Sequence, residues 1–242
     1  MADILLVHGS CHGAWCWRDL LPELVALGHR VRAIDLPSHG ADPTPVAEIT
    51  LDHYARAILA ALEGPTVVVG HSMAGYPISR AAELDATHFA RLVYLAAYVP
   101  WPGHSLAEMR KRAPRQPLAQ AIRLSENSQS FTIDPAWLAN VFYHDCTPEQ
   151  QAFAAANLCP QAVLPQATKV TLGTTYARVP RSYIQCLRDG AVPVEFQATM
   201  ARDFSSEDVY QMDTSHSPFF SAPLTLAGII DQITRQPGDA KI

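Results

Sequence analysis

The chain has 242 residues, a formal net charge of -5, 48% hydrophobic residues and 17% charged residues. This composition is typical of a globular protein that is long enough to bury a sizeable core. An acidic balance without a Lys/Arg run argues against nucleic-acid binding, and no apolar segment reaches the roughly 18 residues of a membrane span. We therefore expect neither nucleic acid nor a membrane as a partner.

Cysteine usage and the start of the chain bear on metal binding and compartment. The five cysteines are odd in number and have no C-x-x-C spacing, so they predict neither a disulfide framework nor a zinc site. The first apolar segment begins at Ile4, without the basic region that opens a secretory signal. The sequence thus predicts a cytoplasmic protein without a metal.

The first hundred residues alternate apolar strands with amphipathic helices. Gly28 is the expected stop of the first helix, and Thr50 is the expected cap of the second. Strands that alternate with helices imply a mostly parallel sheet with right-handed crossovers and helices on its faces, which is the α/β class. In chain order the expected elements are a strand at 4–8, a helix at 17–27, a strand at 29–36, a helix at 50–62, a strand from 66, a helix at 77–84 and a strand at 92–99.

The pattern changes between Trp101 and about Val179. Prolines recur there and no comparable strand appears, although residues 149–158 have a helical composition. Because such a region is too long for an ordinary loop, we interpret it as an inserted helical cap. We expect a core formed by residues 1–100 and 180–242 and a cap formed by residues 101–179. In the second part of the core we expect strands at 181–187 and 208–212, helices at 193–202 and 224–233, and a loose tail from Pro237.

One stretch, TVVVGHSMAG at residues 66–75, carries a chemical signature. A buried strand that ends in a serine between small residues indicates a nucleophile elbow, a tight turn that presents the hydroxyl group of Ser72. Ala74 occupies the second glycine position of the G-x-S-x-G pattern, and a small side chain there meets the steric need. The alternative is that Ser72 only caps a helix.

Asp189 and His216 each follow a predicted strand, at the edge of a parallel sheet where ligands bind. The order Ser72, Asp189, His216 is that of an α/β-hydrolase triad. A serine hydroxyl needs a neighbouring imidazole to take its proton, so His216 is the expected base and Asp189 the residue that orients it. The expected oxyanion donors are the backbone N–H groups of Ser10, in the loop after the first strand, and Met73.

Other histidines compete for the role of base. His8, His12 and His71 lie near the site in the sequence, but His8 and His71 precede the loop and the nucleophile and fit packing or orienting roles better. His53, His88 and His104 fit surface or cap positions.

Other aspartates compete for the role of acid. Asp208 opens a strand at the wrong edge of the sheet, and Asp213 lies only three residues before His216 on the same loop. Asp35 is expected to fix its own loop by side-chain hydrogen bonds. We therefore favour Asp189.

With these residues placed, the chain resembles the α/β-hydrolase branch of plant hydroxynitrile lyases, plant methyl esterases such as the methyl salicylate esterase, and bacterial carboxylesterases including pyrethroid hydrolases. The resemblance covers nearly the whole chain and implies an enzyme without a cofactor, with a buried pocket under the cap. Homodimers are common in this branch. The motifs that carry it are HGSCHGAW at 8–15, LGHRV at 27–31 before Asp35, GHSMAG at 70–75, YIQC at 183–186 before Asp189, and SHSP at 215–218.

Two departures within the branch favour ester hydrolysis over cyanide release. Its hydroxynitrile lyases carry a threonine after the first-loop histidine and a lysine after the catalytic histidine, whereas this chain has Gly9 and Ser217. We therefore expect a serine carboxylesterase that cleaves small, mostly apolar esters through an acyl-enzyme. The alternatives are an amidase or a lactonase with the same triad, a ligand receptor on the same fold, and the disfavoured hydroxynitrile lyase. The expected pocket residues are aromatic: Trp101, Trp137, Phe142, Tyr143, Phe153 and Phe219.

Overall fold

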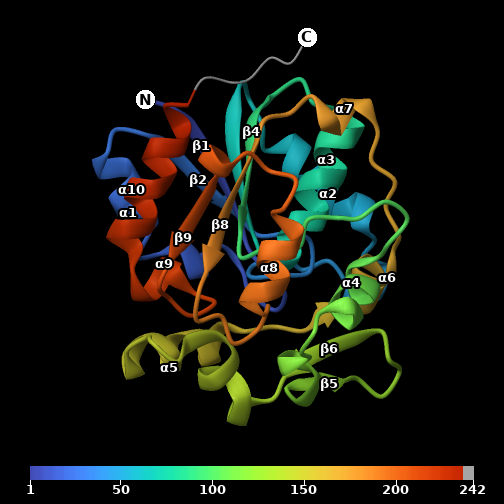
Figure 1. Cartoon of the computed structure of the whole chain (residues 1–242). Helices are drawn as coiled ribbons and strands as arrows, with labels where there is room; N and C mark the ends of the chain where they lie inside the picture. The colour runs from blue at the N-terminus through green and yellow to red at the C-terminus, as the bar shows by residue number, and fades with distance from the viewer. Residues whose placement is uncertain (237–242) are drawn as a thin grey trace.

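The centre of the molecule is a six-stranded parallel sheet with the strand order β2-β1-β3-β4-β8-β9 (Figure 1). It is seen in a computed structural model that describes residues 1–236, so the tail expected from Pro237 lies outside the described residues. The parallel pairing of every neighbouring pair confirms the predicted α/β class. The strands are β1 (Asp3–Val7), β2 (Arg30–Ile34), β3 (Thr66–His71), β4 (Phe89–Leu95), β8 (Arg181–Cys186) and β9 (Val209–Met212).

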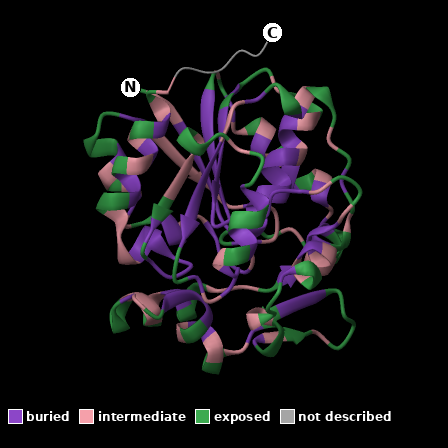
Figure 2. Cartoon of the chain, viewed as in Figure 1, coloured by how far each residue is buried: buried purple, intermediate pink, exposed green. Residues whose placement is uncertain are grey.

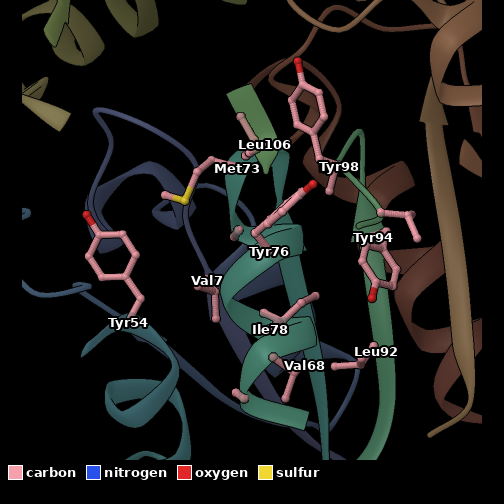
Figure 3. Packing of buried hydrophobic residues seen from close by; sticks show 14 of the residues in the cluster. Val7, Tyr54, Val68, Met73, Tyr76, Ile78, Leu92, Tyr94, Tyr98 and Leu106 are labelled. Carbon is pink, nitrogen blue, oxygen red and sulfur yellow. The ribbon is translucent and has the colours of Figure 1, made fainter. Parts of the chain in front are cut away.

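Helices bury both faces of this sheet, which explains why its strands are continuous apolar runs. Alternate residues of a strand point to opposite faces. Leu5 and Val7 pack into one hydrophobic cluster with α2 (Leu51–Ala60), α3 (Gly75–Leu84) and α8 (Val194–Met200). Ile4 and Leu6 pack into the other cluster with α1 (Leu21–Ala26) and α10 (Pro223–Thr234). Figure 2 shows the central strands as largely buried, and Figure 3 shows Ile78 of α3 beside Val68 of β3.

The first predicted helix is shorter than expected. The chain forms a 3-10 turn at Ala14–Trp17, and α1 begins only at Leu21. Pro22 lies in the first turn of α1, where its missing N–H costs nothing. A helix that started at residue 17 would have placed this proline in its interior. At α2 the expected cap is confirmed, because Thr50 and His53 form a reciprocal capping box.

The segment between β4 and β8 contains several helices and, in addition, strands that were not expected from the sequence. It contains a small antiparallel sheet of β5 (Ile122–Leu124), β6 (Ser130–Ile133) and β7 (Gln161–Ala162). These strands have three, four and two residues, too few to show an alternating pattern. In Figure 1, β5 and β6 lie below the end of the central sheet toward which β8 points. The helices of the segment are α4 (Leu106–Arg112), α5 (Pro148–Asn157), α6 (Val163–Ala167) and α7 (Thr174–Ala177).

Within residues 1–236, no helix combines the length and the apolar character needed to cross a membrane.

Candidate active site

Ser72 lies at a strained turn between β3 and α3. Its φ angle is 56°, in the left-handed region that non-glycine residues seldom adopt. Such a conformation costs on the order of 1–3 kcal/mol, and the surrounding structure must hold it in place. The backbone N–H of Tyr98, after β4, donates to the carbonyl oxygen of Ser72 at 3.0 Å. This backbone strain is the structural counterpart of the elbow expected from the sequence.

The glycines around Ser72 show why Ala74 fits the motif. A Cβ atom on Gly70 would lie 2.7 Å from Cδ1 of Ile78, and one on Gly75 would overlap the carbonyl oxygen of Tyr98. Ala74 instead has φ -60° and ψ -15°, ordinary helical values that accept a side chain. The position that needs glycine is therefore residue 75, where the helix touches the neighbouring backbone.

Asp189 and His216 meet beside the end of the sheet. Nδ1 of His216 lies 2.7 Å from Oδ2 of Asp189, and both side chains are almost fully buried. Gln197 donates to the same oxygen at 2.8 Å, while the N–H groups of Ala191 and Val192 donate to Oδ1. Four donors therefore fix this carboxylate in one orientation. Because Nδ1 of His216 is one of them, the nitrogen of His216 that is left to act as a base is Nε2.

The competing aspartates have other partners. Asp208 forms a 2.6 Å ion pair with Arg91 and accepts from Ser182, before β9 begins. The side chain of Asp213 is 78% exposed and pairs with Arg188. Asp35 accepts from the N–H groups of Ala14 and Ala41, so it fixes its own loop as expected.

His8 and His71 are neutral and form hydrogen bonds with the backbone. Nδ1 of His8 donates to the carbonyl of Gly9 at 2.8 Å, and its Nε2 accepts from the N–H of Leu36. Nε2 of His71 donates to the carbonyl oxygen of His216 at 2.9 Å. Burial is the main cause that lowers the pKa of both imidazoles well below the ordinary range. Neither is placed to act as the base.

His12 supports the loop that carries one expected oxyanion donor. Its Nδ1 donates to the carbonyl of Ser10 at 2.7 Å, and its Nε2 accepts from the hydroxyl of Tyr143 at 2.6 Å. Burial lowers its pKa to about 4, so the ring is neutral at pH 7. The three histidines expected at surface or cap positions lie away from this cluster: His53 caps α2, His88 is exposed, and His104 is partly exposed before α4.

The loop after β1 approaches the nucleophile closely at Gly9. A Cβ on Gly9 would lie 2.9 Å from Nδ1 of His71 and 3.0 Å from Cβ of Ser72. Ser10 and Met73, whose N–H groups are the expected oxyanion donors, both line the cavity at Ser72. The geometry thus brings the two chain segments together at the serine.

The cavity at Ser72 lies between the sheet and the inserted segment. Its volume of about 20 Å³ has room for roughly one water molecule. His216 lines it together with Ser72, and Oγ of Ser72 makes no hydrogen bond among the described residues. From the core the lining consists of Ser10, His12, His71, Ser72, Met73, Tyr98 and His216. From the inserted segment it consists of Leu106, Arg110, Leu118, Ile122, Phe131, Ile133, Phe142 and Gln166.

Of the six aromatic residues expected in the pocket, Phe142 lines this cavity. Trp101 lines a different cavity and packs on Phe196. The other four do not line the cavity. Tyr143 donates a hydrogen bond to His12, and Phe219 packs between Trp17 and His71. Phe153 lies under the guanidinium of Arg18, and Trp137 packs on the hydrophobic cluster that includes α1 and α10.

Several lining residues were not singled out from the sequence. Tyr98 had a usable signal, because it follows β4 at the edge of the sheet that carries Ser72. Arg110 had none, since it is one of three successive basic residues at the end of α4. Arg110 also bears on the comparison with hydroxynitrile lyases, which carry a lysine where this chain has Ser217. A cationic residue does line the cavity here, but it comes from α4 and not from the loop of His216.

Known proteins resemble this chain over most of its length. Residues 4–229 match the model of the alpha/beta hydrolase family. The chain is 32% identical over 249 residues to methylesterase 7 of Arabidopsis thaliana, covering 95% of each chain. It is 29% identical to the pyrethroid hydrolase of Sphingobium wenxiniae, covering 99% of this chain and 90% of that protein. The crystal structure of a pyrethroid hydrolase superposes with a TM-score of 0.86 at 27% identity, covering 98% of this chain and 99% of the other.

Proposed function

This chain belongs to the alpha/beta hydrolase family, and we propose that it cleaves small, mostly apolar carboxylic esters with Ser72, His216 and Asp189. Relatives named methylesterase and pyrethroid hydrolase support its assignment as a carboxylesterase. One observation carries the residue assignment. Ser72, in a strained turn, shares a narrow cavity with His216, whose Nδ1 is held 2.7 Å from a buried carboxylate.

The chemistry follows from this arrangement. His216 accepts the proton of Ser72 as the hydroxyl oxygen attacks the ester carbonyl, and Asp189 stabilises the resulting imidazolium. The N–H groups of Ser10 and Met73 donate to the oxyanion, a contribution of roughly 3 kcal/mol for each donor. His216 then protonates the departing alcohol, and water releases the acid from the acyl-enzyme by the same steps. The hydrogen bond from Ser72 to His216 forms when substrate fills the cavity, since such bonds are often absent without a ligand.

Residues 101–179 serve as a cap over a core of residues 1–100 and 180–242. Support comes from the lining of the cavity, of which α4, β5 and β6 form one wall. Because the cavity has room for roughly one water molecule, this wall must move to admit an ester.

Replacement of the nucleophile tests the proposal. Ser72→Ala should abolish turnover of p-nitrophenyl butyrate and labelling by a fluorophosphonate probe. Ser128→Ala is a matched control, because Ser128 has the same φ of 56° but lies on an exposed turn. Wild-type turnover by Ser72→Ala would overturn the assignment.

A substrate panel separates the related activities. Matched ester, amide and lactone substrates distinguish an esterase from an amidase or a lactonase, and cyanide release from mandelonitrile detects a lyase. Labelling at Ser72 without any turnover, together with ligand-dependent capture of a protein partner, would identify a receptor.

Two expectations about the cellular form belong to the same proposal. We place the protein in the cytoplasm and allow for a homodimer, as in its branch of the family. Cell fractionation tests the first, and light scattering on the purified chain tests the second.

A further inference from the structure

Apolar side chains line the cavity at Ser72 together with several polar ones, and two of the polar ones, Arg110 and Tyr98, come from different elements. Arg110 comes from the last turn of α4, and Tyr98 follows β4 at the edge of the sheet. In Figure 3 the hydroxyl end of Tyr98 points away from the sheet, toward the top of the view. Neither residue has a role in the triad or in the expected oxyanion hole.

Arg110 has no carboxylate partner in the described part of the chain. The lining of the cavity contains no Asp or Glu. On α4 itself, Glu108 is engaged by Lys169 at 3.1 Å and by the N–H of Ser105. Glu195, on α8, is held by Arg115 in a two-point ion pair. The guanidinium of Arg110 can therefore donate hydrogen bonds to an anionic group of a ligand in the cavity.

Tyr98 offers a second donor at the same place. Its side chain is buried, with 3% relative exposure, and its hydroxyl makes no hydrogen bond among residues 1–236. Burial raises the pKa of this phenol, and the charge of Arg110 opposes the rise, which reflects the proximity of the two groups. The hydroxyl is therefore protonated at neutral pH and can donate.

We propose that Arg110 and Tyr98 bind a carboxylate on the substrate, remote from the ester that Ser72 attacks. The inference rests on the proposed esterase function and narrows its substrate class to half esters of dicarboxylic acids. A carboxylate accepts from a guanidinium with two oxygens and has lone pairs left for a phenol. Once the wall has moved to admit substrate, the apolar side chains that line the cavity, such as Leu106, Ile122 and Phe131, can pack on the hydrocarbon chain between the two groups.

A neutral ester of the same length is the weaker ligand for this cavity. It displaces water from Arg110 without supplying a negative charge, so the guanidinium loses hydration and gains no partner. Gln166, the other polar side chain from the inserted segment, already donates to Oγ of Ser10 at 2.7 Å. Arg110 and Tyr98 are thus the cavity's available side-chain donors for a distal group.

Matched substrates test the inference. Monomethyl esters of the dicarboxylic acids from succinate to suberate are compared with methyl esters of monocarboxylic acids of equal length. The ratio of kcat/KM for the half ester to that for the neutral ester should favour the half ester at one or more lengths. In Arg110→Met that ratio should fall by about 10- to 100-fold, the effect of losing a charged hydrogen bond. Arg110→Lys should keep part of the preference, and Tyr98→Phe should reduce it less than Arg110→Met does.

Arg112→Met is the matched control, because Arg112 is exposed on the same helix and should leave the ratio unchanged. Thermal melting identifies any variant that fails to fold. The inference is overturned if no length shows a preference for the half ester, or if Arg110→Met keeps the wild-type ratio.

A binding measurement separates this inference from the esterase proposal. Calorimetry compares the affinity of a half ester for Ser72→Ala with its affinity for the double variant S72A/R110M. Suppose that the wild type hydrolyses no ester, but that the double variant binds the half ester at least tenfold more weakly than Ser72→Ala does. The esterase proposal then fails and the carboxylate site stands. Equal affinities would overturn the carboxylate site whatever the wild type hydrolyses.

Discussion

His71 holds the loop of His216: its Nε2 lies 2.9 Å from the carbonyl oxygen of His216, and the two ring centroids are 4.4 Å apart. The residue just before Ser72 thus also positions the backbone of the expected base. Nδ1 of His71 is buried without a hydrogen-bond partner. The ring therefore makes one polar contact, and that contact joins β3 to the loop after β9.

Removal of this contact should slow the reaction. We expect His71→Leu to lower kcat on p-nitrophenyl butyrate about tenfold, because one hydrogen bond that positions His216 is worth roughly 1–1.5 kcal/mol. His71→Gln retains a donor and should recover part of the rate. An unchanged kcat in a folded His71→Leu variant would show that other contacts suffice to hold His216.

The environment of Asp189 predicts a large effect of an amide. All four partners of the carboxylate are donors, so the NH₂ group of Asp189→Asn must face a donor in either orientation. An NH₂ group facing Nδ1 of His216 also favours the tautomer that carries its proton on Nε2, which cannot accept the proton of Ser72. We expect kcat to fall on the order of 10³- to 10⁴-fold. Asp213→Asn, at an exposed position on the same loop as His216, should keep the wild-type kcat.

The neutral state of His12 predicts a loss of stability in acid. Its pKa is about 4 in the folded chain against an ordinary value of 6.5, so the unfolded chain binds the proton more readily between these values. The contribution is fully present above pH 6.5 and declines as the pH falls toward 4, by about 3 kcal/mol in total.

Urea unfolding of the wild type and His12→Asn between pH 4 and pH 8 measures this contribution. The free energy of unfolding of the variant should depend less steeply on pH. His88→Asn, at an exposed position, should follow the wild-type curve. Parallel curves for the wild type and His12→Asn would contradict the prediction.

The contacts of the elbow predict opposite outcomes at two adjacent positions. Gly75→Ala should destabilise the fold by about 1–3 kcal/mol or more, because the new methyl group overlaps the carbonyl oxygen of Tyr98. Ala74→Gly removes a methyl group at a helical backbone position and should cost about 1 kcal/mol. Thermal melting gives both values. A larger loss for Ala74→Gly than for Gly75→Ala would show that the steric account of the elbow is incorrect.

Much of the core could be predicted because its signals are local. The β-branched run before Ser72 reports a buried strand, and the small residues around the serine report a tight turn. Asp189 and His216 could be named because each follows a strand of a parallel sheet, and such strands all end at one edge. The start of the first helix was missed because Pro22 fixes it at Leu21 in spite of the apolar pattern before it. The small sheet β5-β6-β7 was missed because strands of two to four residues are too short to show an alternating pattern.

By itself, the sequence determined the alternation of strands and helices, the elbow at Ser72 and the order of the three residues expected to act together. Only the tertiary structure decided which side chains line the cavity and which hydrogen-bond partners face the ring nitrogens of His12, His71 and His216. The hydrogen bond between His12 and Tyr143 joins residues 131 positions apart, and no local pattern records such a contact. The same holds for Arg110, whose setting in a run of basic residues resembles an ordinary helix end until the fold brings it to Ser72.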